Sequence, residues 1–135
     1  MKDFNRQLLS ELYDLLSFVD NTYSILSDDL EYPFIYIGNI QTTMTPCKSG
    51  FKYNGTFDIK YYSSFNIISS LTDHYEIIND IKGSLLNTKT DILDLGNEFR
   101  NSILYLQSDI DYEDVRLDSR VFITQLTYYF EIEEI

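Results

Sequence analysis

The residue types that most often carry out chemistry are sparse in this chain. His74 is the single histidine and Cys47 the single cysteine among 135 residues, so a histidine pair, a thiolate metal cluster and an internal disulfide are excluded. His74 falls on the apolar stripe of an expected helix, where a packed histidine with one hydrogen bond is favoured over a catalytic base that lacks a nucleophile. Cys47 precedes Lys48 in an expected loop and is interpreted as an ordinary thiol. We therefore expect no enzyme activity, no catalytic or cofactor-binding residue and no metal site.

Acidic residues form the other candidate for chemistry. Asp109–Glu113 has the alternating carboxylates that open a calcium-binding loop, but Asp114 stands where such a loop needs glycine and Arg120 where it needs glutamate. Because these two positions make the turn and the bidentate clamp, a solvated acidic loop is favoured. Asn54–Thr56 matches a glycosylation sequon, which we interpret as chance because the N-terminal residues lack a secretory signal.

The charge balance excludes several classes of partner. The chain carries 22 acidic and 10 basic residues, a formal net charge of -12. It has no cluster of Lys and Arg of the kind that binds nucleic acid or an anionic membrane surface. A hydrophobic fraction of 44% argues against disorder, and no apolar run approaches the length of a membrane span. We expect one soluble domain over residues 1–135, made and kept in a reducing cytoplasm and without a membrane partner.

The segment Gly50–Ser63 organises the rest of the predicted fold. Its aromatic and aliphatic residues alternate with polar ones, the period of two that marks a strand with one buried face. The other expected elements are helices at Asp3–Val19 and Ile67–Leu86 and strands at Phe34–Thr43, Ile103–Ser108 and Val121–Ile132. Connections are expected at Met44–Ser49, Asn87–Asn97 and Asp109–Asp118. This order, α-β-β-α-β-β, predicts an α+β domain in which two helices pack on an antiparallel sheet of about four strands.

Aromatic residues lie on both faces of the expected strands. Tyr53, Tyr61, Tyr62, Tyr128 and Tyr129 are among the tyrosines on these strands. Two helices can cover one sheet face, and an exposed apolar face is an aggregation hazard. Since interfaces are enriched in Tyr and Phe, self-assembly is favoured over a thicker core within one subunit.

Four stretches together carry a family resemblance over most of the chain. They are the opening helix that ends before Tyr32-Pro33-Phe34-Ile35, the strand Thr56–Tyr62, the helix Asp73–Leu86 and the closing strand Val121–Phe130. In their order and local sequence they resemble the tail terminator proteins of tailed bacteriophages, also called tail completion or head-to-tail joining proteins.

The resemblance implies a structural protein of the virion tail or neck that is assembled in the host cytoplasm. In that family the subunits form a ring, usually a hexamer, that caps the tail tube and joins it to the head connector, and contractile relatives also contact the tail sheath. Six copies would carry a charge of roughly 6 × -12 = -72 around a lumen through which DNA passes without specific binding. The alternatives are another neck or tail-tube subunit of similar fold, and an acidic inhibitor that mimics DNA.

The expected contact segments are the longest extensions from the sheet, the hairpin Thr42–Asn54 and the loop Asp109–Arg120. The interface residues predicted from them are Thr42, Met44, Pro46, Phe51, Tyr53, Tyr112, Arg116 and Arg120.

Overall fold

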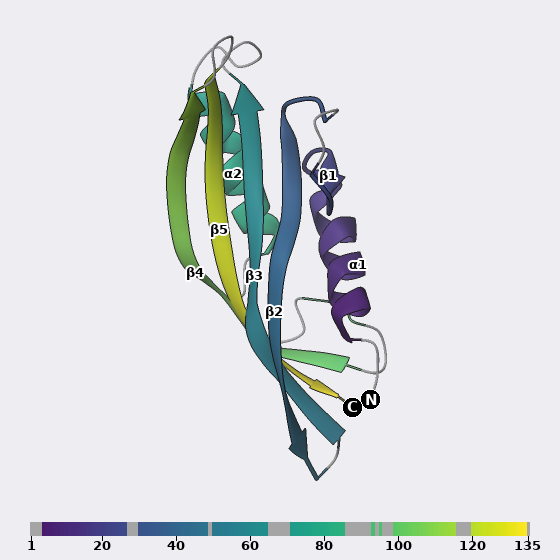
Figure 1. Cartoon of the computed structure of the whole chain (residues 1–135). Helices are drawn as coiled ribbons and strands as arrows, with labels where there is room; N and C mark the ends of the chain where they lie inside the picture. Colours follow the sequence, from purple (N-terminus) through teal and green to yellow (C-terminus); the bar gives the residue numbers. More distant parts are fainter. Residues whose placement is uncertain are drawn as a thin grey trace.

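The computed structural model describes residues 4–26, 30–48, 50–64, 71–85, 93, 95, 99–115 and 120–134. Along the chain the elements are α1 (Phe4–Leu16), β1 (Thr22–Tyr23), β2 (Phe34–Cys47), β3 (Gly50–Ser64), α2 (Leu71–Ser84), β4 (Phe99–Val115) and β5 (Arg120–Glu134). The strands form one sheet in the order β1-β2-β3-β5-β4 (Figure 1). None of the helices in these ranges is long and apolar enough to span a membrane.

The predicted α+β class is confirmed, but the sheet has five strands rather than about four, and the element order gains a strand after the first helix. The additional strand, β1, pairs in parallel with β2 through two residue pairs, Thr22 with Ile35 and Tyr23 with Tyr36. A strand of two residues is too short to give an alternating pattern in the sequence. All other neighbouring strands are antiparallel, as predicted.

The connection expected at Met44–Ser49 is wrong, because β2 continues to Cys47. Met44 pairs with Tyr53, and Pro46 pairs with Phe51. Proline is tolerated here because β1 pairs only with the start of β2. Among the described residues, no strand pairs with this edge of β2 at Pro46, so the missing N–H of the proline removes no inter-strand hydrogen bond there. Gly50, with φ at 137°, supplies the backbone conformation that closes the hairpin.

The acidic connection expected at Asp109–Asp118 is also wrong, because β4 continues to Val115. Its carboxylates have partners on neighbouring elements. Asp109 accepts a hydrogen bond from Lys82 of α2 at 2.6 Å, Asp111 accepts one from Thr124 of β5 at 2.7 Å, and Glu113 pairs with Arg120. An edge strand tolerates such charges.

The helices agree with their predicted stripes but are shorter than expected. The first ends at Leu16, and Ser17–Val19 form a turn rather than a further helical turn. Within the second predicted range, Leu71–Ser84 is helical, and its first residues lie outside the described ranges. The loop expected at Asn87–Asn97 also lies outside them, apart from residues 93 and 95.

Both helices pack on the same face of the sheet. Phe4 of α1 lies against Phe130 of β5 with ring centroids 5.6 Å apart, and Ile78 of α2 belongs to the same core. Figure 1 shows α1 alongside β2 and α2 across the strands toward β4. The largest fully buried side chains of this core are Tyr61, Phe57, Phe130, Leu8, Leu12, Leu16, Ile35, Ile37, Ile59, Ile81, Leu85 and Leu104.

Candidate functional site: the uncovered sheet face

The sheet has a second face, turned away from both helices, which we call the outer face. In the strand register, residues that alternate with the buried row point to it. Across its middle run Tyr36, Lys60, Gln125 and Ile110, one from each of the four long strands. Among the described residues, no helix covers this face.

One end of the outer face is packed by its own aromatic rings. Phe34 stacks on Tyr62 with centroids 4.7 Å apart, and Tyr32 stacks on Phe34 at 5.4 Å. Phe34 is only 4% exposed. Burial, together with the smaller influence of the neighbouring tyrosines Tyr112, Tyr36 and Tyr32, raises the pKa of the Tyr62 hydroxyl to about 12. At this end Phe34 is therefore buried without a partner, whereas Tyr32, Tyr36 and Tyr62 are half-buried.

Along β4, the long edge strand, the apolar side chains on the outer face are exposed to solvent. Ile103, Tyr105, Ile110 and Tyr112 all point to the outer face, and we call them the β4 strip. They are 37%, 50%, 51% and 40% exposed, respectively. Tyr105 lies beside Tyr129 of β5 with ring centroids 5.2 Å apart, so the strip continues onto the next strand. Exposed apolar side chains gathered on one strand mark an interaction surface more strongly than the same residues scattered singly.

The other edge of the sheet is also partly open. Because β1 covers only Ile35 and Tyr36, the part of β2 that follows has no strand on its outer side in the described chain. A groove of about 560 Å³ runs beside it, between β2 and α1. Its lining residues are Asn5, Arg6, Leu9, Ser10, Tyr13, Ser24 and Ile40.

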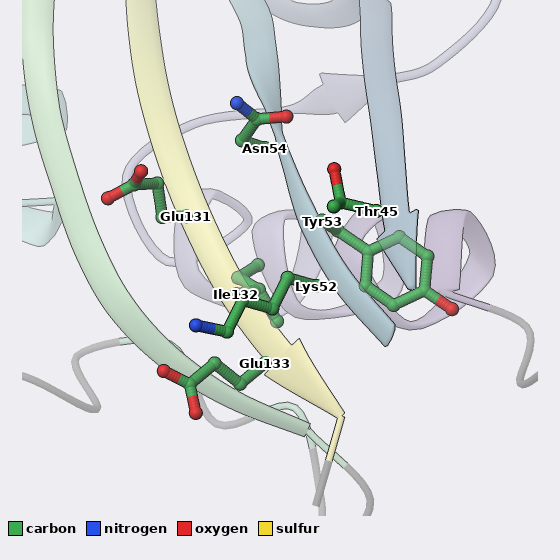
Figure 2. A pocket seen from close by; sticks show the side chains of 7 residues that line it. All are labelled: Thr45, Lys52, Tyr53, Asn54, Glu131, Ile132 and Glu133. Atoms are coloured by element: carbon green, nitrogen blue, oxygen red, sulfur yellow. The ribbon is translucent and has the colours of Figure 1, made fainter. Parts of the chain in front are cut away.

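A smaller hollow of about 230 Å³ lies near the β2–β3 hairpin (Figure 2). Lys52 of β3 extends toward β5, where Glu131 and Glu133 stand on either side of it in this view. Glu133 also pairs with Arg100 of β4 at 3.1 Å. The charges in this hollow thus belong to cross-strand rows on the outer face. Within the described ranges, no group of three or more His, Cys, Asp and Glu is placed to hold a metal ion.

The predicted hairpin residues have mixed surroundings. Met44 and Pro46 are exposed, and Thr42 donates a hydrogen bond to Asn5 of α1 at 3.1 Å. Phe51 is partly buried against the core. Tyr53 is 4% exposed, stacks on the ring of Phe4 and donates a hydrogen bond to Glu134, so it is a core residue and not a surface contact.

The second predicted group lies at the other end of the sheet. Tyr112 belongs to the β4 strip, Arg120 is exposed and pairs with Glu113, and Arg116 lies outside the described residues. The register places Tyr112 beside Ile123, whereas the hairpin meets the far end of β5 near Glu133. The structure therefore does not bring the two predicted groups together.

Sequence reasoning missed Ile103, Tyr105 and Ile110, which with Tyr112 make the strip. A β-bulge between Leu106 and Ser108 shifts the alternation, so odd-numbered residues face outward before it and even-numbered residues after it. The two halves of the strip, read separately, do alternate. That signal is present in the sequence, but the bulge hides its continuity.

The residues first considered for chemistry have structural partners. The ring of His74 is buried and makes two hydrogen bonds rather than the expected one, to Ser63 and Thr124. Cys47 is the exposed last residue of β2, not a loop residue.

No family model and no curated protein matches the sequence. The fold is similar to that of a chain in a solved structure described as the virion of a native gene transfer agent particle. The TM-score is 0.63 and the identity 15%, and the match covers 98% of this chain and 92% of that one. At this identity the likeness concerns the fold, which the two chains share over almost their whole lengths.

Proposed function

We propose that this chain is a structural subunit of a phage-like virion and that its copies assemble through the β4 strip into a ring. The single observation that carries this proposal is the β4 strip, four apolar side chains exposed on an open strand edge. The fold likeness to a chain of a gene transfer agent virion supports the virion setting. The role is structural rather than catalytic.

The two open edges favour a ring over a symmetric pair. A strand edge with unpaired N–H and C=O groups is a template for another strand. Contact between the β4 edge of one copy and the β2 edge of the next is head-to-tail, and such contacts close into rings when the rotation between copies allows it. A closed ring leaves neither edge exposed.

The strand directions are compatible with this arrangement. β2, β3, β5 and β4 are successively antiparallel, so β4 runs opposite to β2 within one copy. When all copies point the same way around a ring, β4 of one meets β2 of the next as an antiparallel pair. The side chains of the β4 strip then lie beside the outer-face side chains of β2 in the next copy, where cross-strand pairs form.

Within the virion, we infer a place at the end of the tail, as in the tail terminator family that the sequence resembles. The ring would be a hexamer that caps the tail tube and contacts the head-to-tail connector and, in a contractile particle, the sheath. With a net charge of -12 on each copy, the ring would repel phosphate, so DNA would pass through without specific binding. A related neck or tail-tube subunit is the nearest alternative.

Substitution in the β4 strip tests the assembly surface. We expect Ile110→Lys to convert assembled protein to monomer, because a charge replaces an apolar side chain at the centre of the strip and edge lysines block strand pairing. Sedimentation velocity measures the assembly, and far-UV circular dichroism checks that the sheet is retained.

The matched control is Asn79→Lys, which adds the same charge at an exposed position of α2 on the helix side of the sheet. It should leave the sedimentation coefficient unchanged. The unmodified protein must be assembled under the conditions of the experiment. If both variants then sediment as it does, the β4 strip is not the contact surface. If both dissociate, net charge and not the strip controls assembly.

A further inference from the structure

A continuous chain of hydrogen bonds runs through the interior from β3 to β4 by way of His74. Ser63 of β3 lies 2.5 Å from His74 Nδ1, and His74 Nε2 lies 2.8 Å from Thr124 Oγ1 of β5. Thr124 donates to Asp111 Oδ1 of β4 at 2.7 Å, and Tyr75 donates to Asp111 Oδ2 at 2.8 Å. One histidine of α2 is thereby tied to three strands.

The chemistry of these groups fixes the direction of the protons. An ionised carboxylate can only accept, so the one hydroxyl proton of Thr124 is committed to Asp111. Thr124 Oγ1 must then accept from His74, which places the imidazole proton on Nε2. Nδ1 is left as an acceptor for the Ser63 hydroxyl. The arrangement is complete only when His74 is neutral.

A second proton on His74 would conflict with this arrangement. It would put an N–H at Nδ1 against the hydroxyl of Ser63, which is 0% exposed and would have to turn its own proton elsewhere in the core. Three aromatic rings surround the imidazole, those of Tyr61, Tyr75 and Phe122, at centroid distances of 5.0, 5.5 and 6.2 Å. They offer little solvation to a charge.

We propose that His74 is an acid-sensitive latch that holds α2 on the sheet while neutral and releases it when protonated. The nearby titratable groups are Tyr61 on β3, Tyr75 and Asp73 on α2, and Asp111 on β4, whereas β5 contributes Thr124 and Phe122 at this site. Of these, only Asp111 favours the imidazolium, and Thr124 stands between it and the ring.

The direction of the His74 pKa shift agrees with a hydrogen-bond arrangement that is complete only for the neutral imidazole. Burial lowers the pKa of His74 below its ordinary value, and the carboxylate of Asp111 opposes this shift only in part. Because the folded chain binds the proton less readily than the unfolded chain, stability is fully present above the unfolded pKa of about 6.5 and falls as the pH drops toward the folded value.

Hydrogen exchange on the full chain tests the latch. Between pH 7.5 and 5.5 we expect the amide protection of α2, corrected for intrinsic exchange, to fall about tenfold, the ratio expected when only the released form takes up a proton with a pKa near 6.5. Protection of α1, which carries no histidine, should change much less. An equal loss in the two helices would overturn the latch.

Two further measurements assign the effect to this residue. His74→Gln, which cannot titrate, should lose the extra pH dependence of α2, and a slope equal to that of the unmodified chain would overturn the proposal. Nuclear magnetic resonance of the unmodified chain supplies a readout that does not require the variant to fold. It should show His74 as the Nε2–H tautomer with a pKa below 6.5, and a pKa at or above 6.5 would contradict the latch.

Discussion

Gly55→Ala should lower the free energy of unfolding substantially. Overpacked positions typically lose about 1–3 kcal/mol, and we expect a loss near the upper end of that range. A Cβ atom at Gly55 would overlap the backbone carbonyl oxygen of Gln41 in β2 and lie 2.8 Å from its carbonyl carbon. Backbone atoms of a paired strand cannot rotate away, so β2 and β3 would have to separate beside the bulge between Gly38 and Gln41. Urea denaturation followed by circular dichroism measures the loss.

The same substitution at Gly38 is the matched control. A Cβ atom there would meet the ring of Tyr36, 2.5 Å from its Cζ, which is the far end of a side chain that can swing away over the outer face. We therefore expect Gly38→Ala to cost clearly less than Gly55→Ala. Equal losses would mean that the close approach of β2 and β3 does not determine the cost.

Phe4→Ala should destabilise the chain by about 3–5 kcal/mol, the usual cost of deleting a buried phenyl ring. The Phe4 ring stacks on Tyr53 at 4.5 Å and contacts Phe99 at 5.7 Å and Phe130 at 5.6 Å. It therefore joins the start of α1 to β3, β4 and β5. The free energy of unfolding of a small domain is about 5–15 kcal/mol, so this one ring accounts for a large fraction of it. The shift of the urea denaturation midpoint measures the loss.

Phe18 provides the comparison for this experiment. It is 92% exposed, just beyond the end of α1, whereas Phe4 is 3% exposed. Phe18→Ala should change stability by no more than about 0.5 kcal/mol, as is usual for surface positions. A loss for Phe4→Ala as small as that for Phe18→Ala would show that α1 is not anchored through this ring.

The parts of the fold that could be predicted are those with an uninterrupted period. The spacing of Phe4, Leu8 and Leu12 gave the buried stripe of α1, and the alternation through Phe57 and Ile59 gave the buried row of β3. The alternation also placed Tyr53 on that buried row, so including it among surface contacts disagreed with the pattern itself.

The rest depended on features with no regular signal. The bulge in β4 shifts which residues face outward, and the second half of β4 is acidic, a composition more typical of a loop. β2 contains another irregularity, where Asn39 has φ at 50° and its side chain donates a hydrogen bond to the buried carboxylate of Asp58 at 2.8 Å. Only the folded sheet brings these two residues, 19 positions apart, into contact.

The sequence predicted that an uncovered apolar sheet face exists, but not which strand carries its exposed side chains. Aromatic residues on both strand faces indicated that one face would stay uncovered, and Tyr62 and Tyr129 do lie on the outer face. Which strand would expose the most apolar side chains depended on the strand order, because β4 is an edge and β5 is not. Strand order could not be read from the chain.

Native mass spectrometry of the unmodified full chain, over a wide range of protein concentrations, tests the assembly proposal most directly. We predict a discrete closed oligomer, with a mass of about 95 kDa if six chains of 15.9 kDa form the ring. A single species of 15.9 kDa at every concentration would contradict the proposal and favour the acidic, DNA-mimicking inhibitor considered as an alternative.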